Sequence, residues 1–267
     1  MQHKKLLTII IILAVSFVGC NKYQKVLKKA DKETKLATAL ELYEKADYVT
    51  CLQFLDQIIP LYRGTDQSQK LFYMYPNCYY KNGDYIMAAY HFKNFIKLYP
   101  NSPQAEEAAF LAAYCAYLDS PESSLEQTSS SIAIEELQTF ANKYPQSEKV
   151  EQCNLLMDEL RQKLAKKEYD IALTYFYIES YQAAHISFTN MLKEYPDSRY
   201  RESAMSFMVK NMYLYAHNSV DAKKEERYRL CVDLANQYVA SFPKASNLKE
   251  IENYIKLSNN KLLTYQK

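Results

Sequence analysis

The chain has 267 residues, a formal net charge of +2, no tryptophan, 26 tyrosines and only three glycines. Its hydrophobic content of 48% and charged content of 24% are those of a globular protein with a real core, which excludes a disordered or collagen-like chain. Because phosphate-cradling loops and tight hairpins depend on glycine, this composition excludes the common nucleotide-binding fingerprints and disfavours turn-rich β folds.

The first nineteen residues have the pattern of an export signal. Lys4 and Lys5 precede an apolar run over 6–18, which would rise only about 20 Å as a helix and is too short to span a bilayer core. The run ends in Phe17-Val18-Gly19-Cys20, which resembles a bacterial lipobox. We therefore expect a lipoprotein signal peptide over 1–19 and acylation of Cys20, with an ordinary signal peptide as the alternative.

Cleavage at this point changes the charge of the protein. Two of the 33 basic residues and none of the 31 acidic ones lie in 1–19, so the mature chain is formally neutral and lacks the electrostatic footprint of a nucleic-acid-binding protein. A local excess of lysine follows the anchor, and it indicates either contact with lipid head groups or a solvated tether. The charged residues of this segment are Lys22, Lys25, Lys28, Lys29, Lys32 and Lys35 against Asp31 and Glu33.

The five cysteines that follow Cys20 form no CxxC pair and no cluster with histidine. An odd number of thiols cannot all pair, although an oxidising compartment favours disulfides. We predict buried, unpaired thiols within helices at Cys51, Cys78, Cys115, Cys153 and Cys231.

An aromatic-proline pair recurs along the rest of the chain at spacings of 37 to 51 residues. Three copies continue as Pro-x-Ser. Proline stops a helix, and the Asn, Asp or Ser that follows it caps the next helix, so each copy marks the end of one repeat. The copies are Tyr99-Pro100, Tyr144-Pro145, Tyr195-Pro196 and Phe242-Pro243, with Tyr62-Arg63 as a degenerate first copy.

Each repeat is predicted to contain a pair of helices. In the second helix of a pair, apolar residues share one face, and a small residue stands where the paired helices approach most closely. These small residues are Cys51, Ala88, Ala133, Ala184 and Cys231. The first helices are predicted over 34–46, 67–82, 103–118, 150–178 and 200–218, with tight links at 46–48, 82–85 and 179–181.

This alternation of helix, short turn, helix and proline stop resembles the tetratricopeptide repeat. The fold class expected is all-α, a right-handed α-solenoid of about five tetratricopeptide-like helix pairs. A lipid anchor and tether over 20–33 would precede repeats one to three over 34–149 and repeats four and five over 150–267. Two departures are expected: a flexible serine-rich loop over 119–131, and a helix that Pro76 kinks or starts late.

No catalytic or metal-binding pattern is visible. His91, His185 and His217 are scattered over different repeats without metal-ligand spacing, and paired acids such as Glu106 and Glu107 diverge on a helix surface. We therefore expect a non-enzymatic protein without cofactor or metal, which uses the concave face of a solenoid to bind other proteins.

Two sets of residues are candidates for binding. The first helices of repeats one and two would present a peptide groove, because tyrosines offer large and stiff contacts; the alternative is that the tyrosines simply pack between helices. The groove residues are Leu40, Glu44, Tyr73, Asn77, Tyr80 and Lys81. On charge grounds, a second partner contact is predicted near the fourth and fifth repeats at Arg199, Arg201, Arg227 and Arg229, with surface solvation as the alternative.

The stretch from Cys78 to Pro103, which contains Asn82-Gly-Asp-Tyr85 and Tyr99-Pro-Asn-Ser102, is similar to the second repeat of the BamD family of outer-membrane assembly lipoproteins. A lipobox, a mature chain of this length and recurring Tyr-Pro-x-Ser links extend the resemblance, with a weaker match at 191–198. The serine-rich third turn and Phe242 depart from the family pattern.

The resemblance implies a non-catalytic scaffold of the β-barrel assembly machinery, anchored by lipid at the periplasmic face of the outer membrane. In that family the N-terminal repeats are associated with nascent outer-membrane proteins and the C-terminal repeats with the periplasmic domains of the barrel subunit BamA. The alternatives are another tetratricopeptide lipoprotein scaffold of cell-envelope biogenesis, and a SusD-like glycan-binding lipoprotein, which short length and the lack of tryptophan disfavour.

Overall fold

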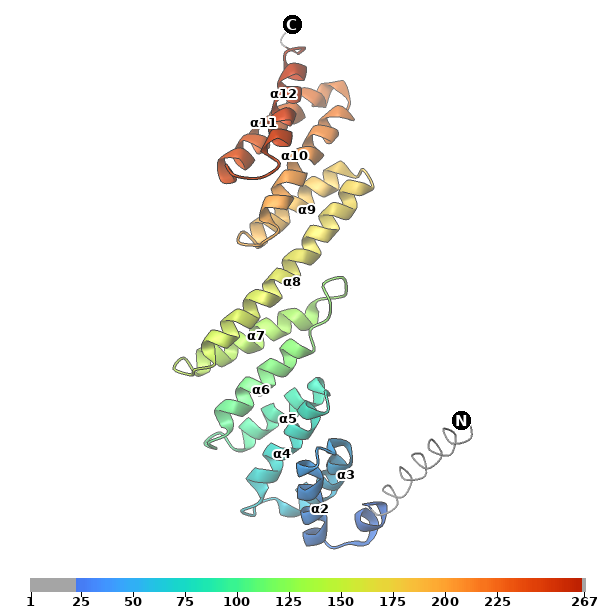
Figure 1. The fold of residues 1–267 in the computed structure, drawn as a ribbon, viewed down its shortest axis with the longest axis vertical. Coiled ribbons are helices and arrows are strands. Elements are labelled where there is room, and N and C mark those ends of the chain that lie inside the picture. The colour runs from blue at the N-terminus through green and yellow to red at the C-terminus, as the bar shows by residue number, and fades with distance from the viewer. Residues whose placement is uncertain (1–22, 266–267) are drawn as a thin grey trace, which may run out of the picture. The chain divides into compact units, whose positions relative to one another are not determined.

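The computed structural model describes residues 23–265, and within that range every regular element is a helix (Figure 1). Residues 23–29 are helical, and the remaining elements alternate as pairs joined by short turns, as predicted. Cys20 and the signal segment lie outside the described residues. The elements are α2 (Lys32–Glu44), α3 (Tyr48–Ile58), η1 (Ile59–Tyr62), α4 (Ser68–Lys81), α5 (Tyr85–Leu98), α6 (Ala105–Leu118), α7 (Thr128–Lys143), α8 (Val150–Tyr177), α9 (Tyr181–Glu194), α10 (Arg201–His217), α11 (Asp221–Ser241) and α12 (Leu248–Leu262).

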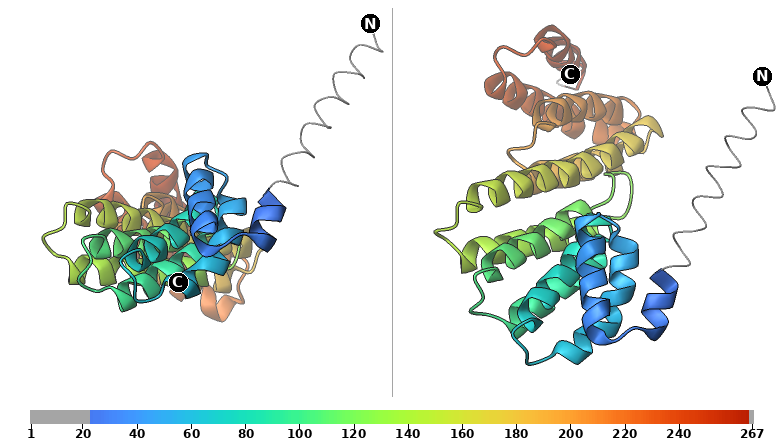
Figure 2. Two further views of the ribbon diagram at one scale, coloured as in Figure 1. Left: turned by 90° about the horizontal axis from the view of Figure 1, so that it is seen from below. Right: turned by 60° about the horizontal axis from the view of Figure 1, so that its bottom comes forward.

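The chain forms two compact units. Of the described residues, the first unit comprises 23–119 and 135–153, and the second comprises 120–134 and 154–265. Within each unit a helix packs mainly on its neighbours along the chain, for example α4 on α5 and α10 on α11 (Figure 2). None of the helices in the described range is long and apolar enough to cross a membrane.

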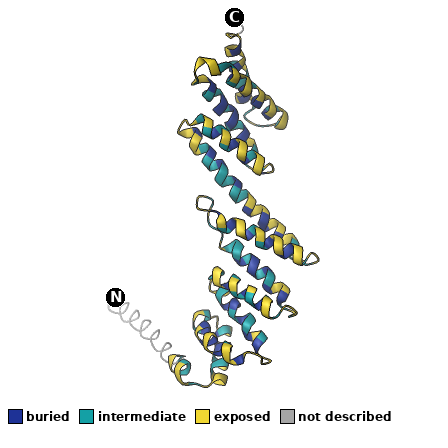
Figure 3. Cartoon of the chain, turned by 180° about the vertical axis from the view of Figure 1, so that it is seen from behind, coloured by how far each residue is buried: buried dark blue, intermediate teal, exposed yellow. Residues whose placement is uncertain are grey.

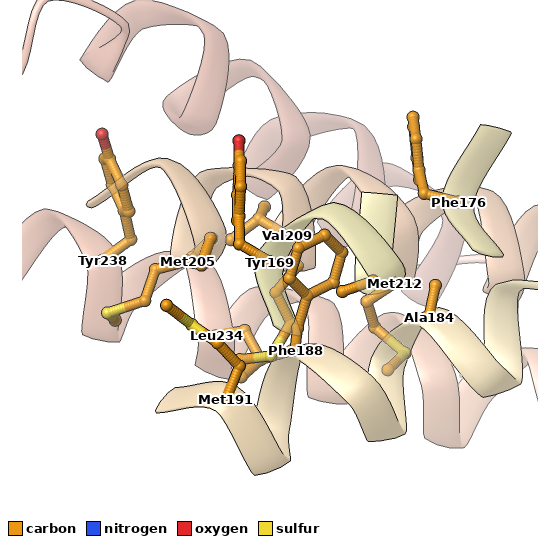
Figure 4. Packing of buried hydrophobic residues seen from close by; sticks show 14 of the residues in the cluster. Tyr169, Phe176, Ala184, Phe188, Met191, Met205, Val209, Met212, Leu234 and Tyr238 are labelled. Carbon is orange, nitrogen blue, oxygen red and sulfur yellow. The ribbon is translucent and has the colours of Figure 1, made fainter. Parts of the chain in front are cut away.

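The cores are stripes of apolar residues along one side of each helix, with exposed residues on the other side (Figure 3). In the second unit, Phe188 and Met191 of α9 belong to one core cluster with Val209 and Met212 of α10 and Leu234 of α11 (Figure 4). The predicted small positions are all fully buried, and Cys51 comes so close to α2 that its Sγ lies 3.2 Å from the Ala39 carbonyl oxygen.

The repeats are joined by turns of nearly constant geometry. Tyr99, Tyr195 and Phe242 end their helices with φ of −124° to −130° and ψ of 60° to 64°, outside the helical region that a following proline disfavours. In each Tyr-Pro-x-Ser turn the serine N–H donates to the tyrosine carbonyl at 3.0–3.1 Å. The serine Oγ then accepts from the backbone N–H two residues later, at Ser102, Ser147 and Ser198, which starts the next helix.

Three turns within helix pairs share a second geometry. Ala46, Gly83 and Glu179 have φ of 57°, 81° and 61°, in the left-handed region. The next residue donates its N–H back to the carbonyl five positions earlier, as in Asp84 to Tyr79 at 3.0 Å, which is the Schellman closure of a helix. The predicted tight links at 46–48, 82–85 and 179–181 are therefore confirmed.

Two local predictions are corrected. Helix α4 begins at Ser68 and continues through Pro76, so the predicted late start is wrong; the fully packed surroundings of Pro76 offset the single hydrogen bond that proline cannot make. The predicted loop over 119–131 ends at residue 127, because the Glu126 carboxylate accepts from the Thr128 N–H at 2.9 Å and Thr128 to Ser131 are helical.

The shortened serine-rich loop is held by specific hydrogen bonds rather than left free. The buried amide of Gln127 donates to the carbonyl oxygens of Glu122 and Leu125. From α8, Lys163 donates to Ser120 Oγ at 2.6 Å and Lys167 donates to the Leu125 carbonyl at 2.6 Å. These contacts tie the loop to the N-terminal residues of α7 and to α8 within the second unit.

Candidate functional site

The predicted groove residues of α4 lie along one face of that helix. Tyr73 is half-buried, with its ring 5.2 Å from that of Phe95, and its hydroxyl donates to Glu107 Oε2 on α6 at 2.7 Å. Burial, and next the hydrogen bond to Glu107, raise the pKa of Tyr73 well above its usual value, so the hydroxyl remains a donor. Tyr73 therefore joins two first helices and presents only part of its ring to a partner.

The other α4 residues divide between structural and exposed positions. Asn77 is buried, and its side-chain amide donates to the Tyr73 carbonyl of the same helix at 2.8 Å, so it is not free to bind a partner through that group. Tyr80 is half-buried with its ring 6.5 Å from that of Tyr114, and the ammonium of exposed Lys81 lies 5.6 Å from the Tyr80 ring. Of the predicted residues on α4, Lys81 is therefore the exposed one, while Tyr73 and Tyr80 are half-buried.

Helix α6 contributes an aromatic stripe that the sequence reasoning missed. Phe110 stacks on Tyr114 with ring centroids 5.7 Å apart, and Tyr114 stacks on Tyr117 at 5.8 Å, with interplanar angles of 9° and 12°. Spacings of four and three residues place these rings on one face of α6. The same pattern is readable in the sequence of 103–118. We call Tyr80, Phe110, Tyr114 and Tyr117 the aromatic stripe; its three tyrosines are half-buried, and Phe110 is buried.

The two groove residues predicted on α2 take different positions. Leu40 is half-buried against the core that contains Leu42 and Leu55, where it serves packing. Glu44 is exposed at the last position of α2. The ring contacts of the aromatic stripe are made by α4, α5, α6 and α7, so neither Leu40 nor Glu44 of α2 takes part in them.

A hollow of about 420 Å³ lies elsewhere in the first unit, between α3, η1, α4 and α5. Inside it, Tyr75 donates its hydroxyl to Asp56, and the His91 ring is edge-on to Tyr75 at 4.6 Å. Burial lowers the pKa of His91, although Asp56 acts in the opposite direction, so the ring is kept towards its neutral form. Arg63 and Lys97 line the same hollow, which the sequence reasoning did not find.

The four predicted arginines do not form one surface. Arg227 is committed to its own unit: its guanidinium lies 3.7 Å from the Tyr215 ring centroid and donates to the Tyr215 hydroxyl at 2.8 Å and to Ser219. Tyr215 and Ser219 stand at the C-terminal end of α10, whereas Arg199 precedes its N-terminus. Because seventeen helical residues extend about 25 Å, Arg227 is far from Arg199.

The other arginines differ in their partners. Arg229 is paired with Glu225 at 2.7 Å on the surface of α11, and Arg201 donates to the Pro196 carbonyl at 3.2 Å. Arg199 lines a groove of about 450 Å³ in the second unit, with its guanidinium 5.1 Å from the Tyr200 ring centroid. Arg199 therefore faces a concave surface.

The groove beside Arg199, which we call the α10 groove, is built from one face of α10 and the start of α12. Asn247 fixes its floor, because its amide oxygen accepts from the Tyr238 hydroxyl at 2.5 Å and its amide nitrogen donates to Ser206 Oγ at 2.7 Å. Charges of both signs surround this floor, which suits a polar protein surface better than a purely apolar ligand. The charged lining residues are Arg199, Glu202, Lys210 and Glu250.

Within residues 23–265, no three His, Cys, Asp or Glu side chains are arranged to hold a metal ion. His91 lies in the first unit, and His185 and His217 lie on different helices of the second. The five thiols there are buried and unpaired, as predicted. Burial raises the pKa of Cys115 to about 12 and of Cys231 to about 11, which keeps both as unreactive thiols.

Paired helices with Tyr-Pro-x-Ser joints and open, polar and aromatic surfaces define a repeat protein of the tetratricopeptide class, whose members bind other proteins. The family model YfiO, described as an outer membrane lipoprotein, matches residues 29–230. The chain therefore belongs to the YfiO family of outer membrane lipoproteins, which confirms the resemblance to the BamD family.

Comparison with characterised protein sequences gives no significant match. Among solved structures, the TPR domain of P58(IPK) is similar with a TM-score of 0.39 and 15% identity, over 93% of this chain and 59% of that one. The TPR2AB domain of yeast Sti1, solved as a complex with pHSP90, has a TM-score of 0.40 and 11% identity over 85% and 98% of the two chains. The chain thus spans about three fifths of the P58(IPK) structure.

Proposed function

We propose that this protein is a lipid-anchored scaffold at the periplasmic face of the outer membrane that assists the folding and insertion of outer-membrane β-barrel proteins. The observation that carries the proposal is membership of an outer membrane lipoprotein family over 29–230. The lipobox at Cys20 supports the anchor, and the repeat surfaces support a role in binding proteins rather than in catalysis.

The two units offer chemically different surfaces. We assign nascent outer-membrane protein segments to the aromatic stripe, since flat tyrosine faces bind extended chains with little loss of side-chain freedom. We assign the periplasmic domains of a BamA-type barrel subunit to the α10 groove, where charges of both signs allow specific pairing.

The decisive experiment is affinity capture of the lipoprotein from membranes, combined with its depletion. Recovery of a BamA-type subunit and a fall in outer-membrane β-barrel levels are expected. Recovery of cell-wall or glycan-processing enzymes with unchanged barrel levels would instead favour another envelope scaffold or a glycan-binding lipoprotein.

The surface assignment has its own test in a matched pair of variants. Arg199→Gln should weaken capture of the barrel subunit, because Arg199 lines the α10 groove, while Arg229→Gln should not, because Arg229 is paired on α11. A photo-crosslinker at Tyr80 should trap nascent chains more than one at Tyr90, an exposed tyrosine of α5. Equal effects within either pair contradict the corresponding assignment.

A further inference from the structure

The helix at 23–29 is docked on the first repeat rather than extended as a tether. Tyr23, Val26 and Leu27 pack partly buried against the core formed by α2, α3 and α4. Gln24 adds a long hydrogen bond to Gln53 of α3 at 3.5 Å. A solvated tether would leave these three apolar side chains in water. Because they pack on the core instead, the side of the helix that faces the first repeat is fixed.

This rotation turns a row of lysines outward. Lys25, Lys28 and Lys29 are exposed, and at 100° per residue they lie about 180° around the helix from the packed apolar side chains. The ion pairs of the described residues do not include any of the three. Lys32, at the start of α2, is not part of this row: its ammonium lies 3.6 Å from the Glu33 carboxylate and 5.4 Å from the Tyr62 ring centroid. We call Lys25, Lys28 and Lys29 the basic face.

The basic face lies only a few residues after Cys20, and this short distance indicates which surface it can reach. From Cys20 to Tyr23 the chain spans at most about 11 Å. An acyl group on Cys20 that enters a bilayer would therefore hold this helix at the level of the lipid head groups. The mature chain is formally neutral, so its attraction to an anionic surface has to come from such a local face and not from overall charge.

We propose that the basic face binds the phosphate head groups of anionic phospholipids in the leaflet that carries the anchor. The proposal rests on the proposed acylation of Cys20 for its location, but the lysines supply the recognition. Lysine ammonium groups attract anionic lipid phosphates through charge that salt screens, whereas the acyl anchor inserts regardless of salt.

The test uses the mature chain from position 20 with Cys20→Ser, which keeps every described residue and removes the anchor. Its partitioning is measured by flotation with phosphatidylcholine vesicles, with and without phosphatidylglycerol at about 30 mol%. We expect binding only to the anionic vesicles, a loss at high salt, and a further loss of roughly tenfold or more in the triple variant Lys25→Gln, Lys28→Gln, Lys29→Gln.

The matched control removes three exposed lysines elsewhere, as Lys244→Gln, Lys249→Gln, Lys256→Gln, and changes net charge equally. It should bind as the parent does, with thermal unfolding of both variants verifying their folds. Equal losses of vesicle binding in the two triple variants, or no preference for anionic vesicles, overturn the proposal. It is also overturned if the basic face binds an acidic protein but not the anionic vesicles. The mass of the exported wild-type chain reports acylation separately, so failure of the anchor is distinguishable from failure of the basic face.

Discussion

The side-chain amide of Gln69 donates to Ser102 Oγ at 2.9 Å and joins the start of α4 to the turn that precedes α6. A glutamine–serine contact recurs in the second unit with the direction reversed: Ser198 Oγ donates to Gln162 Oε1 at 3.4 Å, and the Arg199 N–H donates to the same oxygen at 3.0 Å. Ser102 and Ser198 thus each cap the helix that follows and also bond to the first helix of the repeat that they end.

Gln69→Ala should lower the free energy of unfolding by about 1 kcal/mol, because it leaves a half-buried serine without its inter-repeat partner. The control is Gln138→Ala, whose exposed amide bonds only within α7, and it should change stability by less than about 0.5 kcal/mol. Chemical denaturation of both variants measures the difference, and equal costs would contradict a role for Gln69 in joining repeats.

At the turn residues with left-handed backbone, replacing glycine should lower stability and introducing glycine should raise it. Gly83→Ala should cost about 1 kcal/mol of unfolding free energy, since no atom lies within 4 Å of the added Cβ and only the backbone strain at φ +81° changes. Glu179→Gly, at φ 61°, should raise stability by up to about 1 kcal/mol. Thermal and denaturant unfolding check both signs, and destabilisation by Glu179→Gly would show that its side chain matters more than its backbone.

The buried thiols should resist modification in the folded protein. In the Cys20→Ser chain, a maleimide should label none of the five cysteines under native conditions and all five in denaturant, as read by intact mass. Cys51 Sγ lies 3.7 Å from Cys78 Sγ, and their mutual contact together with burial raises the pKa of Cys78 strongly. Rapid native labelling of either thiol would contradict their burial.

Stability should fall as the pH drops below about 6.5. Burial lowers the pKa of both His91 and His185, so the unfolded chain takes up protons at a higher pH than the folded protein does. Their contribution is therefore complete above the unfolded pKa and is lost progressively as the pH falls below it, towards the lowered pKa of the folded protein. Unfolding midpoints of the parent and of the double variant His91→Gln, His185→Gln check this: the variant should show the smaller decrease.

Acylation predicts a visible effect of Cys20→Ser in cells. The variant should accumulate as uncleaved precursor or as protein released from the membrane, and it should lose incorporation of labelled fatty acid. A variant that removes a buried thiol, Cys115→Ala, is the control and should keep the label. Normal labelling of the Cys20→Ser chain would exclude this residue as the attachment site.

Local signals made much of the fold predictable. Proline after an aromatic residue, aspartate at helix starts and glycine at position 83 act through neighbouring backbone atoms, and the helix ends fall within about two residues of those expected. Prediction failed where tertiary packing decides, since packing carries α4 through Pro76. The helix at 23–29 is likewise stabilised by docking on the core. Prediction also missed one local signal, because the Glu126 carboxylate caps α7 among serines that resemble a loop.

The candidate site was less predictable than the fold. Helical spacing placed Tyr73, Asn77 and Tyr80 on one face, but it did not reveal that Asn77 and most of Tyr73 serve packing. Stacking of Phe110 on Tyr114 depends on side-chain rotamers, and the separation of Arg199 from Arg227 depends on the antiparallel course of α10 and α11. The spacing of aromatic residues in the sequence does not give their rotamers, and a count of charges does not give the distance between two arginines.

Because the aromatic-proline turns have nearly the same geometry, a change of length inside a repeat is independent of the junction between repeats. The dihedral angles at Tyr99, Tyr195 and Phe242 are almost the same, although the repeats that they end differ in length. A repeat can therefore lengthen a helix or an inner loop and acquire a new outer surface without disturbing its junction with the next repeat. The turn makes the repeats exchangeable modules, and recombination at these prolines is where functional chimaeras of this protein should be built.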